Sequence, residues 1–154
     1  MIAIIAEKPS VGQEIARVVG ATEKKDGYIT GNGYMVTWAL GHLVSLALPG
    51  TYGYTRTTAE DLPMLPEPFR LVERQIRTDR GMVTDIAAGR QLKVIDGVFS
   101  ECDSIIVATD AGREGELIFR WIYSHLGCTK PFKRLWISSL TDEAIRKGMA
   151  DLRE

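Results

Sequence analysis

Residues 104–126 read SIIVATDAGREGELIFRWIYSHL, and this stretch decides the fold. Its first part, Ser104–Thr109, is a short apolar run, which is typical of a strand buried on both faces of a parallel sheet. Its second part, Glu114–Leu126, is a predicted helix that Gly127 ends. A buried strand followed closely by a helix is the repeating unit of an α/β fold.

The same alternation of strand and helix occurs at both ends of the chain. Ile2–Ala6 is another apolar run, and residues 9–19 have helical spacing up to Gly20, a residue that suits a helix end. Further along, we expect a third core strand at Arg134–Ile137 and a last helix that begins at Thr141. Strands that alternate with helices indicate a mostly parallel central sheet flanked by helices.

Three other segments depart from that alternation. Tyr28–Thr30 and Tyr34–Leu40 flank a Gly-Asn-Gly turn at residues 31–33, which predicts a small antiparallel hairpin. Residues 49–68 have no period, so we expect an ordered surface excursion there. Residues 79–99 have helical spacing. The predicted fold is therefore α/β and Rossmann-like, with a small antiparallel hairpin added to a mostly parallel sheet.

Length and charge narrow the functional classes only slightly. The 154 residues suit one domain, and we predict a single domain over residues 1–154. Lys and Arg number 19 against 20 Asp and Glu, so the net charge is −1. The overall electrostatic field of the chain therefore does not favour binding to nucleic acid. Any contact with DNA must come from a local patch or from parts of the protein outside this chain.

The cysteines and apolar runs point to a cytoplasmic protein. Cys102 and Cys128 have no CxxC spacing, which excludes a zinc knuckle in this segment and fits a reducing compartment. The most apolar later stretch, residues 36–48, is interrupted by Gly41 and His42. We therefore predict no membrane span and no membrane partner.

Acidic residues follow two of the predicted strands. Glu7 comes directly after Ile2–Ala6, and Asp110 comes directly after Ser104–Thr109. Because functional groups collect at the carboxyl ends of parallel strands, neighbouring strands would bring both acids to one edge of the sheet. Glu114 lies four residues past Asp110, in the first helical turn, and is predicted to face the same site.

Three gathered carboxylates need a compensating charge. Two unit charges ~5 Å apart cost roughly 3 kcal/mol at an effective dielectric constant of ~20. Oxygen ligands without Cys or His suit Mg²⁺, and Lys8 and Arg113 flank the acids where they could hold a phosphate. The alternative is that the acids only stabilise helix N-termini, by ~0.3–1 kcal/mol each. Residues 111–115 match neither the dinucleotide-binding nor the P-loop motif, so a bare phosphate site is excluded.

Four ordered motifs resemble one protein family. They are residues 4–10 (IIAEKPS), 41–43 (GHL), 109–116 (TDAGREGE) and 136–145 (WISSLTDEAI). Together they resemble the Toprim domain of bacterial type IA DNA topoisomerases, in particular the topoisomerase III branch. The likeness covers essentially the whole chain, which would then be a fragment of a larger multidomain enzyme.

The resemblance implies roles for the residues around the acids. Glu7 would be the family's invariant acid, and Lys8 would contact the scissile phosphate. Asp110 and Glu114 would bind Mg²⁺ together with Glu7, and Arg113 would assist Lys8 at the DNA. His42, in the GHL motif, is either a structural histidine or a residue that faces DNA.

The chain departs from the family pattern at one position. Toprim proteins usually carry Asp-x-Asp, whereas this chain has Gly112 two residues after Asp110. That difference removes one candidate ligand, so we expect weaker Mg²⁺ binding than the full pattern implies.

Type IA enzymes cleave and rejoin one DNA strand through a phosphotyrosine intermediate. Residues 54–57 (YTRT) loosely resemble the family's Tyr-Pro-Arg-Thr motif but lack its proline, so we expect the nucleophilic tyrosine to lie outside this chain. The implied partners are a single-stranded region of duplex DNA and the remaining domains of the parent enzyme. The implied location is the cytoplasm, in association with the nucleoid.

Other functions stay open at this point. A primase or nuclease of the same superfamily would share the acids, although the 41–43 and 136–145 motifs argue against it. A non-catalytic Toprim module that binds DNA or a repair partner would not need both Glu7 and Asp110. Trp38, Trp121 and Trp136 are predicted to be packing residues.

Overall fold

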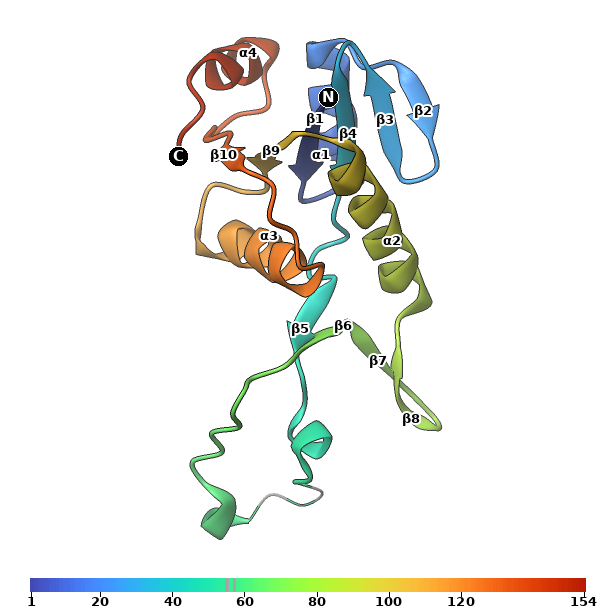
Figure 1. Cartoon of the computed structure of the whole chain (residues 1–154), viewed down its shortest axis with the longest axis vertical. Coiled ribbons are helices and arrows are strands. Elements are labelled where there is room, and N and C mark those ends of the chain that lie inside the picture. The colour runs from blue at the N-terminus through green and yellow to red at the C-terminus, as the bar shows by residue number, and fades with distance from the viewer. Residues whose placement is uncertain (55, 57) are drawn as a thin grey trace.

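The computed structural model describes residues 1–54, 56 and 58–154. Within them, a central sheet of six strands has the order β10-β9-β1-β4-β3-β2 (Figure 1). Four neighbours, β10, β9, β1 and β4, run parallel, and β3 and β2 add antiparallel strands at one edge. The strands are β1 (Ile2–Ala6), β2 (Glu23–Lys25), β3 (Tyr28–Gly31), β4 (Tyr34–Trp38), β9 (Ser104–Ala108) and β10 (Phe132–Arg134). The prediction of a mostly parallel α/β sheet with an antiparallel hairpin is confirmed.

Helices cover both faces of this sheet. They are α1 (Pro9–Val19), α2 (Ile86–Glu101), α3 (Arg113–His125) and α4 (Asp142–Ala150). Side chains of a strand alternate between the two faces. Accordingly, Ala3 and Ile5 pack under α2 and α3, whereas Ile4 and Ala6 pack under α1 and α4. Continuous apolar runs in β1 and β9 are therefore what two-sided burial requires.

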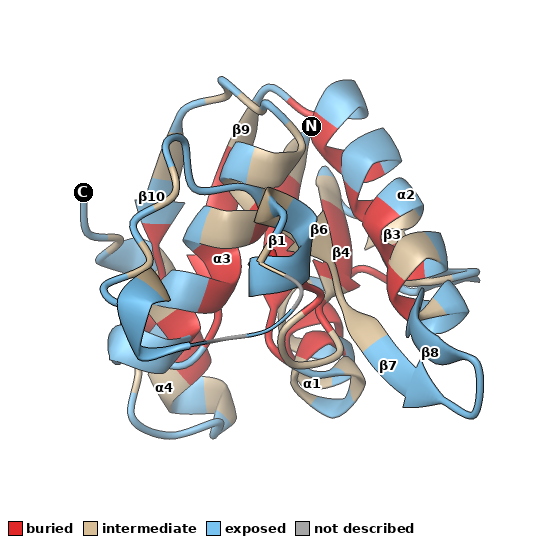
Figure 2. Cartoon of the chain, turned by 90° about the horizontal axis from the view of Figure 1, so that it is seen from below, coloured by how far each residue is buried: buried red, intermediate tan, exposed pale blue. Residues whose placement is uncertain are grey.

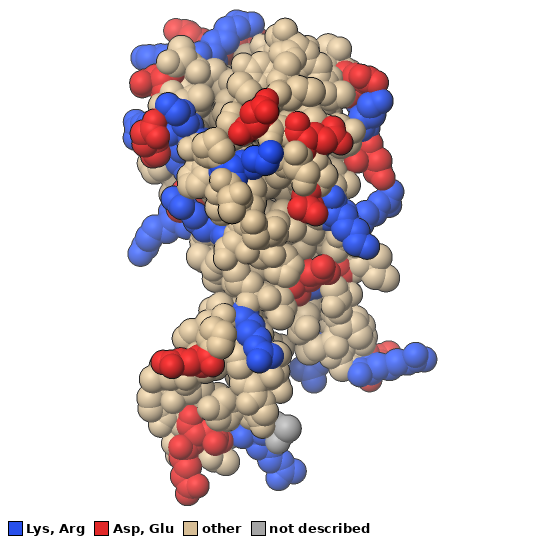
Figure 3. Space-filling view, viewed as in Figure 1, with Lys and Arg blue, Asp and Glu red and all other residues tan. Residues whose placement is uncertain are grey.

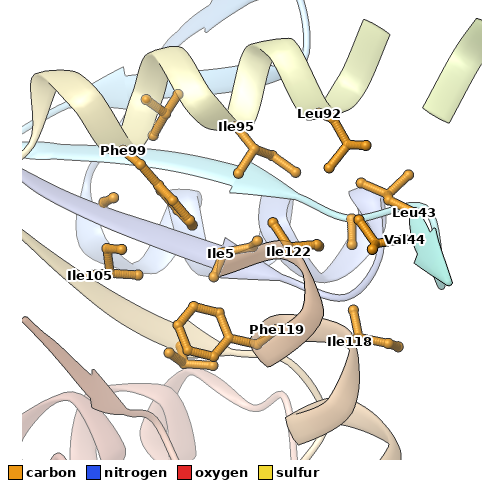
Figure 4. Packing of buried hydrophobic residues seen from close by; sticks show 14 of the residues in the cluster. Ile5, Leu43, Val44, Leu92, Ile95, Phe99, Ile105, Ile118, Phe119 and Ile122 are labelled. Atoms are coloured by element: carbon orange, nitrogen blue, oxygen red, sulfur yellow. The ribbon is translucent and has the colours of Figure 1, made fainter. Parts of the chain in front are cut away.

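The larger of the two apolar clusters lies between the sheet and the α2–α3 layer. Figure 4 shows Leu92, Ile95 and Phe99 reaching from α2 toward the strands, with Phe119 and Ile122 of α3 on the same side. The buried faces of the strands and helices form a continuous interior, while solvent-facing residues cover the outside (Figure 2). This packing holds the carboxyl ends of β1 and β9 side by side.

Two short strands begin an extension that leaves the body of the molecule. β5 (Val44–Leu46) pairs with β6 (Leu71–Glu73). The chain between these two strands projects away from the central sheet (Figure 1). We call the described residues from β5 to β6 the arm. It contains two short 3₁₀ helices, η1 (Pro49–Tyr52) and η2 (Ala59–Asp61). The predicted surface excursion at residues 49–68 falls within the arm, although Thr55 and Thr57 lie outside the described residues.

The helix expected over residues 79–99 is wrong in its first part. Residues 75–84 form a hairpin of β7 (Gln75–Thr78) and β8 (Gly81–Thr84), and α2 begins only at Ile86. The reason is local: Gly81 turns with a φ of 106°. Asp85 then caps the helix by accepting a hydrogen bond from the Ala87 N–H at 2.9 Å.

The third core strand is also displaced from its predicted range. β10 ends at Arg134, and residues 135–140 form a loop instead of continuing the strand. Trp136 in this loop is 44% exposed, so its predicted role as a packing residue is wrong. A tryptophan between the apolar residues Leu135 and Ile137 suggests a buried strand, but here only Leu135 is fully enclosed.

No helix in the described part of the chain is both long and apolar enough to cross a membrane. On the face drawn in Figure 3, basic and acidic side chains are interspersed over the body and the arm, as a net charge of −1 suggests.

Candidate functional site

The candidate site begins where β1 and β9 end. The two strands are parallel neighbours with Ala6 beside Ala108, so the residues that follow them meet at one edge. Glu7 is only 8% exposed, and its Oε2 accepts a hydrogen bond from the Asp110 N–H at 3.2 Å. Asp110 itself is exposed. One carboxylate is therefore built into the fold, and the other faces solvent beside it.

A close approach of two backbones shapes the turn between β9 and α3. A Cβ placed on Gly115 would lie 2.1 Å from the carbonyl oxygen of Asp110, which no side chain can tolerate. The Thr109 hydroxyl donates to the Gly115 carbonyl at 2.7 Å and ties the two ends of the turn together. Gly115 thus lets the first turn of α3 sit directly against the Asp110 backbone.

Arg134 supports this turn from β10. Its side chain is 9% exposed, and its Nη1 donates to the Thr109 carbonyl at 3.2 Å. Its Nη2 donates to Glu116, which also accepts from Arg120 at 2.6 Å. Burial alone acts to raise the pKa of Glu116, but the Arg120 hydrogen bond and the Arg134 charge outweigh it, so this pKa lies below its usual value. Glu116 is therefore an ionised structural partner of Arg120 and Arg134.

Glu114 makes a different contact from the one its position predicts. Its side chain is 73% exposed, and its Oε1 lies 2.5 Å from Nε2 of His42. The His42 ring also stands against Trp121, with ring centroids 5.6 Å apart. The loop that carries His42 is held by Arg74, which donates to the His42 carbonyl at 3.2 Å.

Arg74 is fixed in turn by the cap of α2. Its Nη2 lies 2.7 Å from the Asp85 carboxylate, and its hydrogen bond lowers the pKa of Asp85 below the usual value. Arg74 belongs to the basic run of residues 70–80, but unlike a solvated surface residue it joins three segments of chain. The base of the arm is in this way connected to the loop beside α3.

The structure therefore brings two of the three predicted acids together. The Glu7 carboxylate accepts from the backbone N–H of Asp110, whereas Glu114 is paired with His42. In the described residues no group of three or more His, Cys, Asp or Glu side chains is close enough to hold a metal ion. The donor set still fits Mg²⁺, which often takes one or two carboxylates and keeps several waters. Glu7, Asp110 and, if it leaves His42, Glu114 could supply oxygen ligands.

The predicted basic residues stand at two helix N-termini. Lys8 is the N-cap residue of α1, and Arg113 is the first residue of α3; both are exposed. A hollow of about 560 Å³ opens beside Asp110, between α1 and the loop at residues 135–140. The edge of the sheet thus combines acids, bases and open space, as an anionic substrate would require.

Three contributors to this site were not identified from the sequence. Thr109, Gly115 and Arg134 build the turn without carrying the chemistry. The Gly-Arg-Glu-Gly pattern at residues 112–115 could have suggested a close backbone approach, since glycine is favoured there. Nothing local marks Arg134, because its partners lie far away along the chain.

Comparison with known proteins gives a consistent result. The family model for the Toprim domain matches residues 2–140. DNA topoisomerase 3 of Bacillus subtilis is 46% identical over 154 aligned positions, and that of Bacillus thuringiensis is 48% identical over 155. DNA topoisomerase 3 of Bacillus licheniformis is 46% identical. Each match covers 97% of this chain but 20% of the relative, so the chain spans about a fifth of the length of these proteins.

Proposed function

This chain belongs to the Toprim domain family, and from that membership we propose that it is the Mg²⁺-binding catalytic module of a type IA DNA topoisomerase. One observation carries the proposal: Glu7 and Asp110 meet at the ends of two adjacent parallel strands. The likeness of 46–48% to part of DNA topoisomerase 3 from three Bacillus species supports the choice of enzyme. The remaining domains of the parent protein would be its constant partners.

Glu7 and Asp110 are the residues proposed to hold the metal. When bound, Mg²⁺ would neutralise charge on a DNA phosphate. Glu7 is already oriented by the Asp110 N–H, which leaves its second oxygen available. Glu114 would join them by exchanging its contact with His42 for the metal. Gly112 offers no carboxylate, so affinity depends on these acids alone.

Lys8 and Arg113 are proposed to act on the DNA phosphate. Both are exposed at helix N-termini beside the acids, where the N–H groups and the helix dipole also favour an anion. Their positive charges would orient the scissile phosphate and stabilise the charge that develops on it. His42 would contribute through Glu114 and, once released from it, could face the DNA.

The reaction proposed for the whole enzyme cleaves and rejoins one strand in a single-stranded region of a duplex. A tyrosine attacks the phosphate and forms a phosphotyrosine link, which is later reversed. We place that tyrosine outside this chain. Tyr54 lies in the arm, directly after η1 and far along the chain from both acids, with its N–H bonded to the Pro49 carbonyl at 3.2 Å. Activity on chromosomal DNA would locate the enzyme in the cytoplasm, at the nucleoid.

A chimera tests this function. The chain would replace its matching fifth of Bacillus subtilis DNA topoisomerase 3, and relaxation of negatively supercoiled plasmid would be measured with Mg²⁺. We expect the chimera to relax the plasmid and a Glu7→Gln variant to lose more than about 100-fold of that activity, as expected when transition-state charge stabilisation is removed.

Glu101→Gln is the matched control, because Glu101 is an exposed acid at the far end of α2. It should relax plasmid as the unaltered chimera does. A folded chimera that is inactive, or one that Glu7→Gln leaves fully active, would contradict the proposed function.

A further inference from the structure

A second hollow lies on the other side of the Asp110–Gly112 turn. It measures about 730 Å³ and is bounded by α3, β10 and the residues before Glu154. Its lining is mostly apolar and includes Leu117, Phe132 and Trp136. Of the residues proposed above to bind the metal or the DNA, Arg113 lines this hollow, whereas Glu7, Lys8, His42, Asp110 and Glu114 are not in its lining. Trp136 is one of the exposed large apolar residues of the described chain.

Trp136 is held in place there. The guanidinium carbon of Arg153 lies 5.1 Å from the centre of its ring. Arg153 is itself fixed, because its backbone pairs with that of Arg134 through two hydrogen bonds of 2.7 and 2.9 Å. An exposed aromatic ring held by its neighbours loses little conformational freedom when a ligand binds to it.

The charges around the hollow favour an anion. Four arginines and two glutamates line it: Arg113, Arg120, Arg134, Arg153, Glu116 and Glu154. Glu116 lies between Arg120 and Arg134, and Glu154 is paired with Lys133 at 2.8 Å. Arg113 and Arg153 are both exposed residues of the lining. An apolar lining with exposed cations suits a ligand with flat rings and phosphates.

The hollow also adjoins the candidate site. Trp136 and Ala111 line both this hollow and the one beside Asp110. A linear ligand with one phosphate at Asp110 would therefore cross Trp136 as it continues. A nucleic-acid strand has this form, since each phosphate is followed by a base that can stack on an aromatic ring.

We propose that Trp136 stacks on a base of single-stranded DNA next to the phosphate at the acidic edge, with Arg153 and Arg113 beside the flanking phosphates. This inference rests on the proposed function and adds to it a base-stacking role for Trp136, which the sequence alone suggested to be a packing residue. Stacking of this kind is tolerant of sequence, because every base presents an aromatic face. The occupant is DNA, since an apolar protein segment would leave these exposed arginines without partners.

The test measures binding of an end-labelled oligodeoxythymidylate to the 154-residue chain by fluorescence anisotropy at low salt. Loss of one base-stacking contact weakens binding by about fivefold or more, so Trp136→Leu should show that loss. Trp136→Phe keeps an aromatic ring and should stay within about threefold of the unaltered chain. Quenching of tryptophan emission by the oligonucleotide should also fall in both variants.

Phe69→Leu is the matched control, because it removes an exposed aromatic ring from the arm and should not change affinity. All variants should melt at the same temperature as the parent. Equal affinity of Trp136→Leu and the unaltered chain would overturn the inference and would show that the hollow serves another partner, such as a protein segment. Absence of any binding would overturn it too, whereas plasmid relaxation by the chimera would still support the proposed function.

Discussion

The turn between β9 and α3 and the arm use their side chains in opposite ways. Buried side chains hold the turn in place: the Thr109 hydroxyl donates to the Gly115 carbonyl, and Arg134 donates to the Thr109 carbonyl. The arm presents several large apolar residues to solvent, among them Leu62, Leu65 and Phe69. Directly after the arm, Arg74 bonds to Asp85 and to the Leu40 carbonyl.

The body of the molecule therefore positions the acids, whereas the arm exposes apolar surface. The acids are placed by the sheet and its helices, so the geometry at Glu7 and Asp110 should not depend on the arm. The arm has the exposed apolar surface of a segment that packs against something else.

The largest effect expected from this comparison separates two phenylalanines. Phe119 is fully buried in the body, with its ring centre 4.9 Å from that of Phe132, whereas Phe69 in the arm is 58% exposed. Phe119→Ala should lower the free energy of unfolding by about 3–5 kcal/mol. Phe69→Ala should change it by less than about 0.5 kcal/mol. Urea denaturation measures both, and similar losses would mean that the arm is part of the cooperative core.

A smaller effect is expected from two glycines at the turn itself. Alanine in the first turn of a helix normally stabilises it relative to glycine. Gly115→Ala should nevertheless destabilise the chain by about 1–3 kcal/mol or more, because its Cβ would collide with the Asp110 backbone.

Gly112→Ala provides the comparison for this substitution. Gly112 has an extended backbone with a φ of −178°, and an added Cβ would meet nothing within 4 Å. Its free energy of unfolding should stay within about 0.5 kcal/mol of the parent value. If thermal melts instead rank Gly112→Ala as the more damaging change, the close packing of α3 against Asp110 is wrong.

The sequence predicts the sheet edge well because its evidence is local. β1 and β9 are short apolar runs, each followed by an acid. A continuous apolar run of this length is typical of a strand buried on both faces of a parallel sheet. That the two strands are neighbours, with Ala6 beside Ala108, is a condition of the prediction that the structure supplies. The helix after Asp110 has its own amphipathic spacing, so the strand and helix that carry Asp110 could be predicted, and the meeting of the two acids only on that condition.

Other parts depend on contacts that no local pattern contains. The pairing of Glu114 with His42 joins residues 72 positions apart, and the Arg134–Thr109 bond joins residues 25 apart. Residues 79–84 have apolar residues at helical spacing, yet the turn at Gly81 makes them a hairpin. The two side-chain pairings are decided by tertiary structure, whereas the hairpin is decided locally by the turn at Gly81.

The central claim is that Glu7 and Asp110 share one Mg²⁺ ion. It is tested most directly by titrating the 154-residue chain with Mg²⁺ while amide chemical shifts are recorded. We expect the largest shifts at residues 6–8 and 109–115, and we expect Asp110→Asn to abolish them without unfolding the chain. Shifts that centre on other acids, or that survive unchanged in Asp110→Asn, would contradict the claim.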